Sequence, residues 1–174
     1  LNKKSFKSNF LRFLNKVISL LFITLFSLII FNEIIINGLE SILLYLLLIC
    51  ICSDTGGLIF GKIFKGKKLT KISPNKTISG SVGSFVLSLS LVPFFYYILS
   101  QKNNDFFDLV LLSIFVSFFC QLGDLFISWL KRKAKVKDTS NLLPGHGGFL
   151  DRIDGILFAI PAGMLLWELL LNIK

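Results

Sequence analysis

The chain has 174 residues, of which 53% are hydrophobic, and a formal net charge of +9. Soluble domains average about 45–50% apolar residues, and here the apolar residues form runs that reach the roughly 20 residues needed to cross a bilayer. This composition argues against a soluble or a disordered chain. The three cysteines, Cys50, Cys52 and Cys120, all lie within apolar runs, so we interpret them as small hydrophobic residues rather than disulfide or zinc partners.

Five membrane segments are predicted in chain order. They cover approximately residues 13–36, 42–60, 82–100, 106–130 and 153–173. The first follows a basic N-terminus, as in a signal peptide, but it is too long and lacks a small-residue cleavage site. We therefore expect an all-α fold, a polytopic membrane helical bundle that forms one domain over residues 1–174.

The positive charges indicate how the segments are oriented. Except for Lys102 and Lys174, all 19 Lys and Arg residues lie in the N-terminal segment or in the long loops after the second and fourth segments. The positive-inside rule places those regions in the cytoplasm, with the short turns at 37–41 and 101–105 outside. We expect a multi-pass protein of the cell inner (plasma) membrane whose site faces the cytoplasm, and no nucleic-acid partner.

A polar stripe follows the fourth segment. Gln121, Asp124, Ser128 and Lys131 recur at helical spacing and share one face, whereas the opposite face is apolar. An ionisable side chain within a membrane helix is costly, and such residues are functional by default. The alternative is a hydrogen-bonded contact between helices near a salt bridge. We expect Asp124 to belong to a functional site.

Asp54 lies near the cytoplasmic end of the second segment. Gly57 and Gly61 follow it with a spacing that lets another backbone come close, although this spacing alone is more often only packing. The basic run from Lys62 to Lys68 comes next. We interpret this region as having room for a phosphate-bearing ligand, with Asp54 as a polar residue of the site.

Charged residues and glycines gather where the fifth segment begins. The stretch is Pro144-Gly145-His146-Gly147-Gly148-Phe149-Leu150-Asp151-Arg152-Ile153-Asp154. Asp151 and Asp154 share a face if a helix begins here, although such a pair is often only a cap. Carboxylates that bind Mg²⁺, with Lys and Arg nearby, are what phosphoryl transfer requires. The single histidine, His146, has either a structural or a catalytic role.

These positions form one long pattern that resembles the signature of phosphatidate cytidylyltransferases. The pattern is Ser128-x-x-Lys131-Arg132-x4-Lys137-Asp138-x5-Pro144-x-His146-Gly147-Gly148-x-x-Asp151-Arg152-x-Asp154. Further stretches that resemble the family are Asp54-Thr55 with Gly61-Lys62, the loop from Ile72 to Thr77 ending at Gly80, and Gln121-x-Gly123-Asp124. The resemblance covers roughly residues 42–174. Ser79 and Leu58 depart from it, because members usually carry an acidic residue and an aromatic residue there.

The resemblance implies an enzyme that transfers CMP from CTP to phosphatidate, giving CDP-diacylglycerol and pyrophosphate in phospholipid biosynthesis. It implies Mg²⁺ as the cofactor, with Asp124 and Asp151 as the main ligands and Asp154 in support. The expected partners are CTP, phosphatidate and the lipid bilayer, and a homodimer is left open. The catalytic set would also include Lys131, Arg132, Lys137, His146 and Arg152. Substrate binding would involve Asp54, Lys76, Ser128, Gly147 and Gly148.

Three alternatives stay open at this point. A CTP-dependent enzyme acting on another lipid is the nearest, because lipid choice depends on apolar pockets. A CDP-alcohol phosphatidyltransferase would pair Asp-Gly-x-x-Ala-Arg with Gly-x3-Asp-x3-Asp, whereas this chain has only Gly147-x3-Asp151 followed by x2 and Asp154. A transporter that conducts ions along the aspartates would not explain the lysine-rich loop.

The most specific expectation concerns Asp124 and Asp151. Antiparallel helices joined by a cytoplasmic loop would bring both residues to one metal site, and the loop from Lys131 to Leu150 would fold over it and present Lys137 and His146. The chain begins with Leu1 rather than Met, as a fragment or a chain with an upstream start would. We expect it to lack N-terminal helices that are usual in the family.

Overall fold

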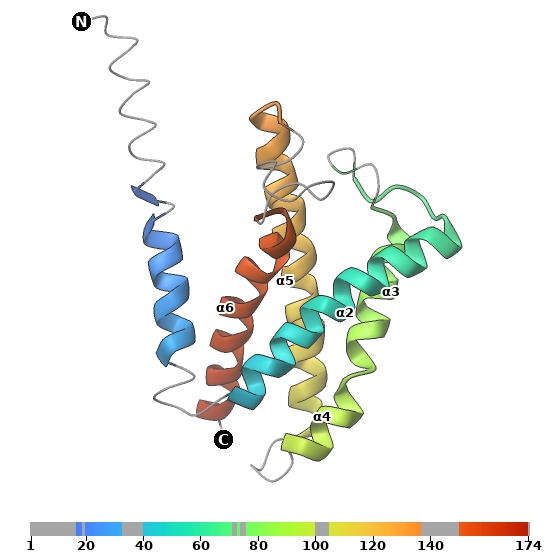
Figure 1. The fold of residues 1–174 in the computed structure, drawn as a ribbon. Helices are drawn as coiled ribbons and strands as arrows, with labels where there is room; N and C mark the ends of the chain where they lie inside the picture. The colour runs from blue at the N-terminus through green and yellow to red at the C-terminus, as the bar shows by residue number, and fades with distance from the viewer. Residues whose placement is uncertain are drawn as a thin grey trace, which may run out of the picture. The chain divides into compact units, whose positions relative to one another are not determined.

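The computed structural model describes residues 17–18, 20–32, 40–70, 73, 76–99, 105–136 and 150–173. Of residues 150–152 and 173 it describes only the backbone. The chain divides into two compact units, Leu1–Leu39 and Glu40–Lys174. In the first, the described part contains an apolar helix, Leu20–Phe31. The second contains α2 (Glu40–Phe64), α3 (Ile78–Leu89), α4 (Val92–Leu99), α5 (Phe106–Lys133) and α6 (Leu150–Ile173), drawn in Figure 1.

Four helical stretches in the described part of the chain are long and apolar enough to cross a membrane. They are Glu40–Phe64, Ile78–Ile98, Phe106–Lys133 and Ile153–Asn172. Many large apolar side chains on these stretches are exposed, Leu58 and Leu169 among them, which is what a surface facing lipid requires. The all-α, multi-pass character predicted from the sequence is confirmed, and the first predicted segment is described as the shorter helix Leu20–Phe31.

The third predicted segment is not one continuous helix. It begins earlier than expected and is divided into α3 and α4 at Ser90 and Leu91. Pro93 explains the break, because proline has no N–H to donate to the carbonyl of Leu89 and its ring would clash with that carbonyl in a continuous helix. The proline instead lies in the first turn of α4, where a missing N–H costs little.

Helices α2 and α3 pack closely along a seam of glycines. A Cβ atom added to Gly56 would lie 2.5 Å from the carbonyl oxygen of Gly83, and one added to Gly80 would lie 2.7 Å from that of Gly57. Only glycine permits backbones to approach this closely. The close approach predicted for Gly57 and Gly61 is confirmed, because both face the start of α3.

Helices α5 and α6 form a second close pair. A Cβ atom on Gly123 would lie 3.1 Å from the carbonyl oxygen of Asp154, and one on Gly155 would lie 2.7 Å from the sulfur of Cys120. The most extensive helix contacts in this unit are those within the two pairs, α2 with α3 and α5 with α6.

Buried hydroxyl groups join the two pairs. Tyr45 on α2 donates to the carbonyl oxygen of Leu109 at 3.2 Å and bonds the hydroxyl of Ser113 on α5. Two turns further along α2, the hydroxyls of Ser53 and Ser117 lie 3.0 Å apart. Because an unpaired hydroxyl would be costly in an apolar interior, these bonds fix how α2 lies against α5. Apolar side chains from α2, α4, α5 and α6 fill the rest of the core.

Candidate active site

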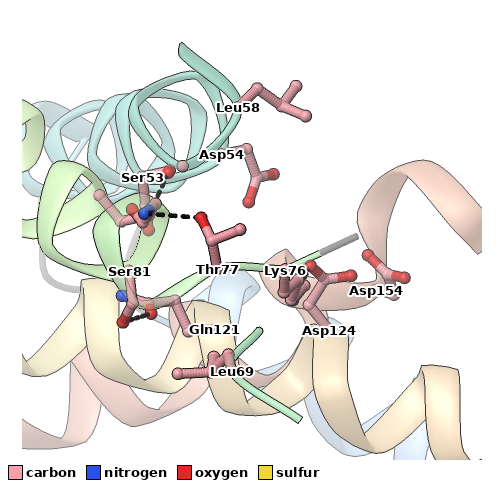
Figure 2. A pocket seen from close by; sticks show the side chains of 13 residues that line it. Ser53, Asp54, Leu58, Leu69, Lys76, Thr77, Ser81, Gln121, Asp124 and Asp154 are labelled. Atoms are coloured by element: carbon pink, nitrogen blue, oxygen red, sulfur yellow. Dashed lines mark hydrogen bonds and ion pairs between the residues drawn. The ribbon is translucent and has the colours of Figure 1, made fainter. Parts of the chain in front are cut away.

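A cavity of about 250 Å³ lies at the end of the helices where α2 and α5 finish and where α3 and α6 begin. Its wall includes Asp54 from α2, Asp124 from α5, Asp154 from α6 and Lys76 from the segment before α3 (Figure 2). Three carboxylates and one ammonium group therefore meet from four separate parts of the chain. Hydroxyl and amide side chains complete much of the polar lining: Ser53, Thr77, Ser81, Ser84 and Gln121.

The crossing of α5 and α6 brings Asp124 and Asp154 together. Each is the chain neighbour of a glycine at that crossing, Gly123 and Gly155, and the short distances at both glycines draw the two carboxyl groups into one place. Figure 2 shows these carboxyl groups beside each other. Asp154 is 7% exposed and accepts a hydrogen bond from the backbone N–H of Gly155 at 2.9 Å. Two negative charges this close repel unless a cation lies with them.

Lys76 supplies a positive charge in this structure. Its ammonium group forms an ion pair with the carboxylate of Asp124, and the two side chains are 26% and 28% exposed. The backbone carbonyl of Lys76 accepts from Leu69 at 2.8 Å, and its N–H donates to Ser73 at 3.1 Å. The next residue, Thr77, forms a bridge to Lys68 and caps α3 by accepting from the N–H of Gly80.

Asp54 faces the same cavity from α2. The thiol of Cys120 donates to its Oδ1, with sulfur and oxygen 3.6 Å apart. Cys50 and Cys120 are buried and all three cysteines are free thiols, as expected of small hydrophobic residues. The contact of Cys120 with Asp54 adds a polar role that the sequence interpretation missed.

The polar stripe predicted on the fourth segment is present on α5. Lys131 Nζ lies 3.9 Å from Asp154 Oδ2, so this lysine reaches the acidic group from the last turn of the helix. Ser128 and Arg132 lie on the same terminal part of α5, half-buried and exposed respectively. Toward the start of α5 the stripe extends from Gln121 to Ser117 and Ser113, each four residues from the next. The sequence prediction did not include these two serines.

Several predicted site residues lie outside the described part of the chain. Lys137, His146, Gly147 and Gly148 are not described, and of Asp151 and Arg152 only the helical backbone at the start of α6 is. The expected meeting of Asp124 with Asp151 therefore stays a prediction. The carboxyl group of Asp154, expected in support, lies beside that of Asp124.

The carboxylate pair suits a hard divalent cation. Mg²⁺ commonly binds one or two carboxylates and completes its shell with water and substrate phosphates, and Asp124 and Asp154 provide two carboxylates in a half-buried cavity. The described residues contain no cluster of three or more His, Cys, Asp or Glu side chains suited to a metal. Among the described residues, Asp124 and Asp154 are the two carboxylates that would hold Mg²⁺, and Lys76 is paired with the first of them.

The sequence interpretation did not include the serine side chains that line the cavity. Ser53, Ser81 and Ser84 lie in apolar segments, where serine is usually a packing residue. Ser84 Oγ donates to the carbonyl oxygen of Ser53 at 2.7 Å, and Ser81 Oγ donates to Gln121 Oε1. Ser81 and Ser84 are three residues apart on α3, a spacing that places both near one face of a helix. This spacing, next to Gly80, was the feature of the sequence from which a polar face could have been predicted.

Together the helices and the cavity define a polytopic membrane protein with a carboxylate and lysine site at one end of its helices. The family model described as the cytidylyltransferase family matches residues 1–170, and the chain belongs to that family. The resemblance found in the sequence motifs is thereby confirmed.

Two curated relatives carry the same name. The chain is 44% identical over 126 residues to the phosphatidate cytidylyltransferase of Staphylococcus haemolyticus, which covers 72% of this chain and 48% of that protein. It is 46% identical over 110 residues to the Bacillus subtilis protein of the same name, covering 63% of this chain and 40% of that protein. The chain thus spans about half the length of the curated relatives it matches.

Proposed function

We propose that the chain forms the catalytic part of a phosphatidate cytidylyltransferase, which transfers CMP from CTP to phosphatidate. The observation that carries the proposal is the convergence of Asp124, Asp154 and Lys76 at one cavity, with Lys131 Nζ 3.9 Å from Asp154 Oδ2. An oxygen of the lipid phosphate forms a bond to the α-phosphorus of CTP. The bond from that phosphorus to the oxygen bridging to the β-phosphorus breaks, and pyrophosphate leaves with that oxygen.

The substrate itself provides the nucleophile, so the protein has to position and neutralise phosphates. Lys76 contacts Asp124 and Lys131 lies near Asp154, so each carboxylate of the pair has a cation beside it that can bind a triphosphate. Positioned cations of this kind lower the barrier by stabilising charge on the leaving group. Thr77 and Ser81 line the same cavity, and their hydroxyl groups can bond phosphate or ribose oxygens.

Mg²⁺ is the expected cofactor, held by Asp124 and Asp154, with Asp151 as the further predicted ligand. When bound, it would neutralise phosphate oxygens and orient them for in-line displacement. Arg132, Lys137, Arg152 and His146 remain candidates for contacts to phosphates, and Asp54, Ser128, Gly147 and Gly148 for contacts to substrate.

The orientation follows from charge. The last turn of α5 and the segment that follows α2 are rich in basic residues, and both lie at the same end of the helices as the cavity; the positive-inside rule assigns such ends to the cytoplasm. We infer that CTP enters from the cytoplasm and that the protein resides in the inner (plasma) membrane. Leu58, 62% exposed on the cavity wall, provides an apolar surface beside the site for the lipid chains.

The test is direct. The chain, purified in detergent, is incubated with CTP labelled at the α-phosphate, phosphatidate and Mg²⁺, and label in the organic phase is counted. We expect lipid-soluble label that requires both phosphatidate and Mg²⁺ and is lost with a chelator. CTP labelled at the γ-phosphate should leave its label in water as pyrophosphate.

Two controls sharpen the result. Replacing phosphatidate with a polyprenol or diacylglycerol acceptor should give no product, and label transfer to one of those lipids would favour the alternative substrate. The full-length Bacillus subtilis relative serves as the positive control in the same detergent. If it is active while the present chain gives no lipid-soluble label, the proposal for this chain is refuted.

A further inference from the structure

Asp124 already holds a cation that belongs to the protein. The ammonium group of Lys76 pairs with the carboxylate that would also bind Mg²⁺, and the carboxyl group of Asp154 lies next to it. The ammonium group of Lys76 and a divalent ion at the same carboxylate would repel each other. Binding of the ion at Asp124 is therefore favoured when the side chain of Lys76 moves away.

The structure shows how that movement can be limited to one side chain. The backbone of Lys76 is held by hydrogen bonds to Leu69 and Ser73, and the following residue caps α3. In contrast, the lysine stem has four carbons and a strongly hydrated, mobile head. The side chain is a quarter exposed and borders a cavity of about 250 Å³, which leaves room for a different rotamer.

Building on the proposed function, we propose that Lys76 is a displaceable counter-ion that pairs with Asp124 in the empty site and passes to a substrate phosphate when a divalent cation binds. The ammonium group is then available to the triphosphate only after the ion has taken its place. Because each event assists the other, metal and nucleotide bind with positive coupling. Lys76 therefore competes with the metal for Asp124 in the empty site and contacts phosphate after the metal has displaced it.

Binding of Mn²⁺ without nucleotide is the first test. The purified wild-type chain and the Lys76→Met variant are titrated with Mn²⁺, and free ion is measured by electron paramagnetic resonance. Removing a competing charge at ion-pair distance should strengthen Mn²⁺ binding at least about tenfold. Lys76→Arg keeps the competing charge and should bind Mn²⁺ about as weakly as wild type.

The matched control is Lys67→Met. Lys67 is an exposed lysine of the same connecting segment, so its replacement removes the same net charge without removing the contact with Asp124. It should leave Mn²⁺ affinity within about twofold of wild type. Weaker or unchanged Mn²⁺ binding in Lys76→Met, equal strengthening in Lys67→Met, or no Mn²⁺ binding by any of the proteins would each overturn the proposal.

A second test uses the unaltered protein. An amine-acetylating reagent is applied in brief pulses, and modification at each lysine is read by mass spectrometry. Acetylation of Lys76 should rise when Mg²⁺ is added and fall again when CTP is added with Mg²⁺, while Lys67 stays constant. No rise with Mg²⁺ would count against displacement.

The two proposals fail separately. Mn²⁺ affinity and Mg²⁺-dependent acetylation are measured without turnover, so they report on Lys76 even if no CDP-diacylglycerol is formed. Conversely, normal product formation combined with unchanged Mn²⁺ affinity in Lys76→Met would leave the proposed function standing and remove the counter-ion role.

Discussion

Replacing Asp124 with asparagine keeps the shape of the side chain and removes the charge that both Lys76 and a divalent cation require. Asp124 lies within the cavity, beside Asp154 and paired with Lys76. Loss of a single well-placed electrostatic group commonly lowers the rate about 10²–10³-fold, equivalent to roughly 3–4 kcal/mol of barrier. We expect Asp124→Asn to lose at least this much activity.

Stability should change far less than activity. The ion pair that is lost joins side chains that are 26% and 28% exposed, and partly solvated pairs contribute only about 0–1 kcal/mol. The substitution also removes the repulsion between Asp124 and Asp154, which offsets part of the loss. The variant should therefore insert, purify and melt like wild type.

The assay is the transfer of α-labelled CTP to phosphatidate in detergent micelles, with thermal unfolding measured on the same preparations. Asp108→Asn is the matched control, because it makes the same chemical change in the first turn of α5, at the far end of that helix. Activity above about one tenth of wild type in Asp124→Asn, with normal folding, would refute its role as a metal ligand. Equal loss in Asp108→Asn would show that the effect is not specific to the cavity.

Three further outcomes are expected. Lys131→Met should raise the KM for CTP about tenfold or more, whereas Lys133→Met, which removes an exposed cation over a tryptophan ring, should leave it within about twofold. Gly56→Leu should lower the free energy of unfolding by at least about 1–3 kcal/mol and lower the unfolding temperature, because the added atoms would clash with the backbone of α3. In a cysteine-free background, Gly66→Cys should be protected from an impermeant thiol reagent in intact cells and Asn103→Cys should react; the reverse would contradict the topology. Residue 103 lies outside the described part of the chain.

Hydropathy predicted the four stretches of the described chain that are long enough to span a membrane, because apolar length is a local property of the sequence; the first predicted segment is described only as the shorter helix Leu20–Phe31. Hydropathy could not predict the break before α4, although Pro93 was a local signal for it. The polar stripe through Asp124 and Lys131 was also visible, because helical spacing alone places those residues on one face.

The meeting of Asp54, Asp124 and Asp154 was less predictable. Spacing determines which residues share a helix face but not which face meets which neighbour. That choice depends on Gly123 and Gly155, where two backbones approach. In the sequence, Asp124 follows Gly123 and Asp154 precedes Gly155. Each aspartate is therefore next to a glycine at which the two helices approach closely. Lys76 reached the site through a short loop whose path no periodicity describes.

The hydroxyl bonds between the two helix pairs have a consequence for how this protein would fail. One pair contributes Asp54 and leads into Lys76, the other contributes Asp124 and Asp154, and Ser53 with Ser117 is one of the links between the pairs, together with the bonds of Tyr45 to Leu109 and Ser113. A substitution there leaves each pair internally intact, because its glycine seam is untouched. The expected defect is an inserted protein in which the site residues of the two helix pairs are less well aligned, so that activity falls more than stability.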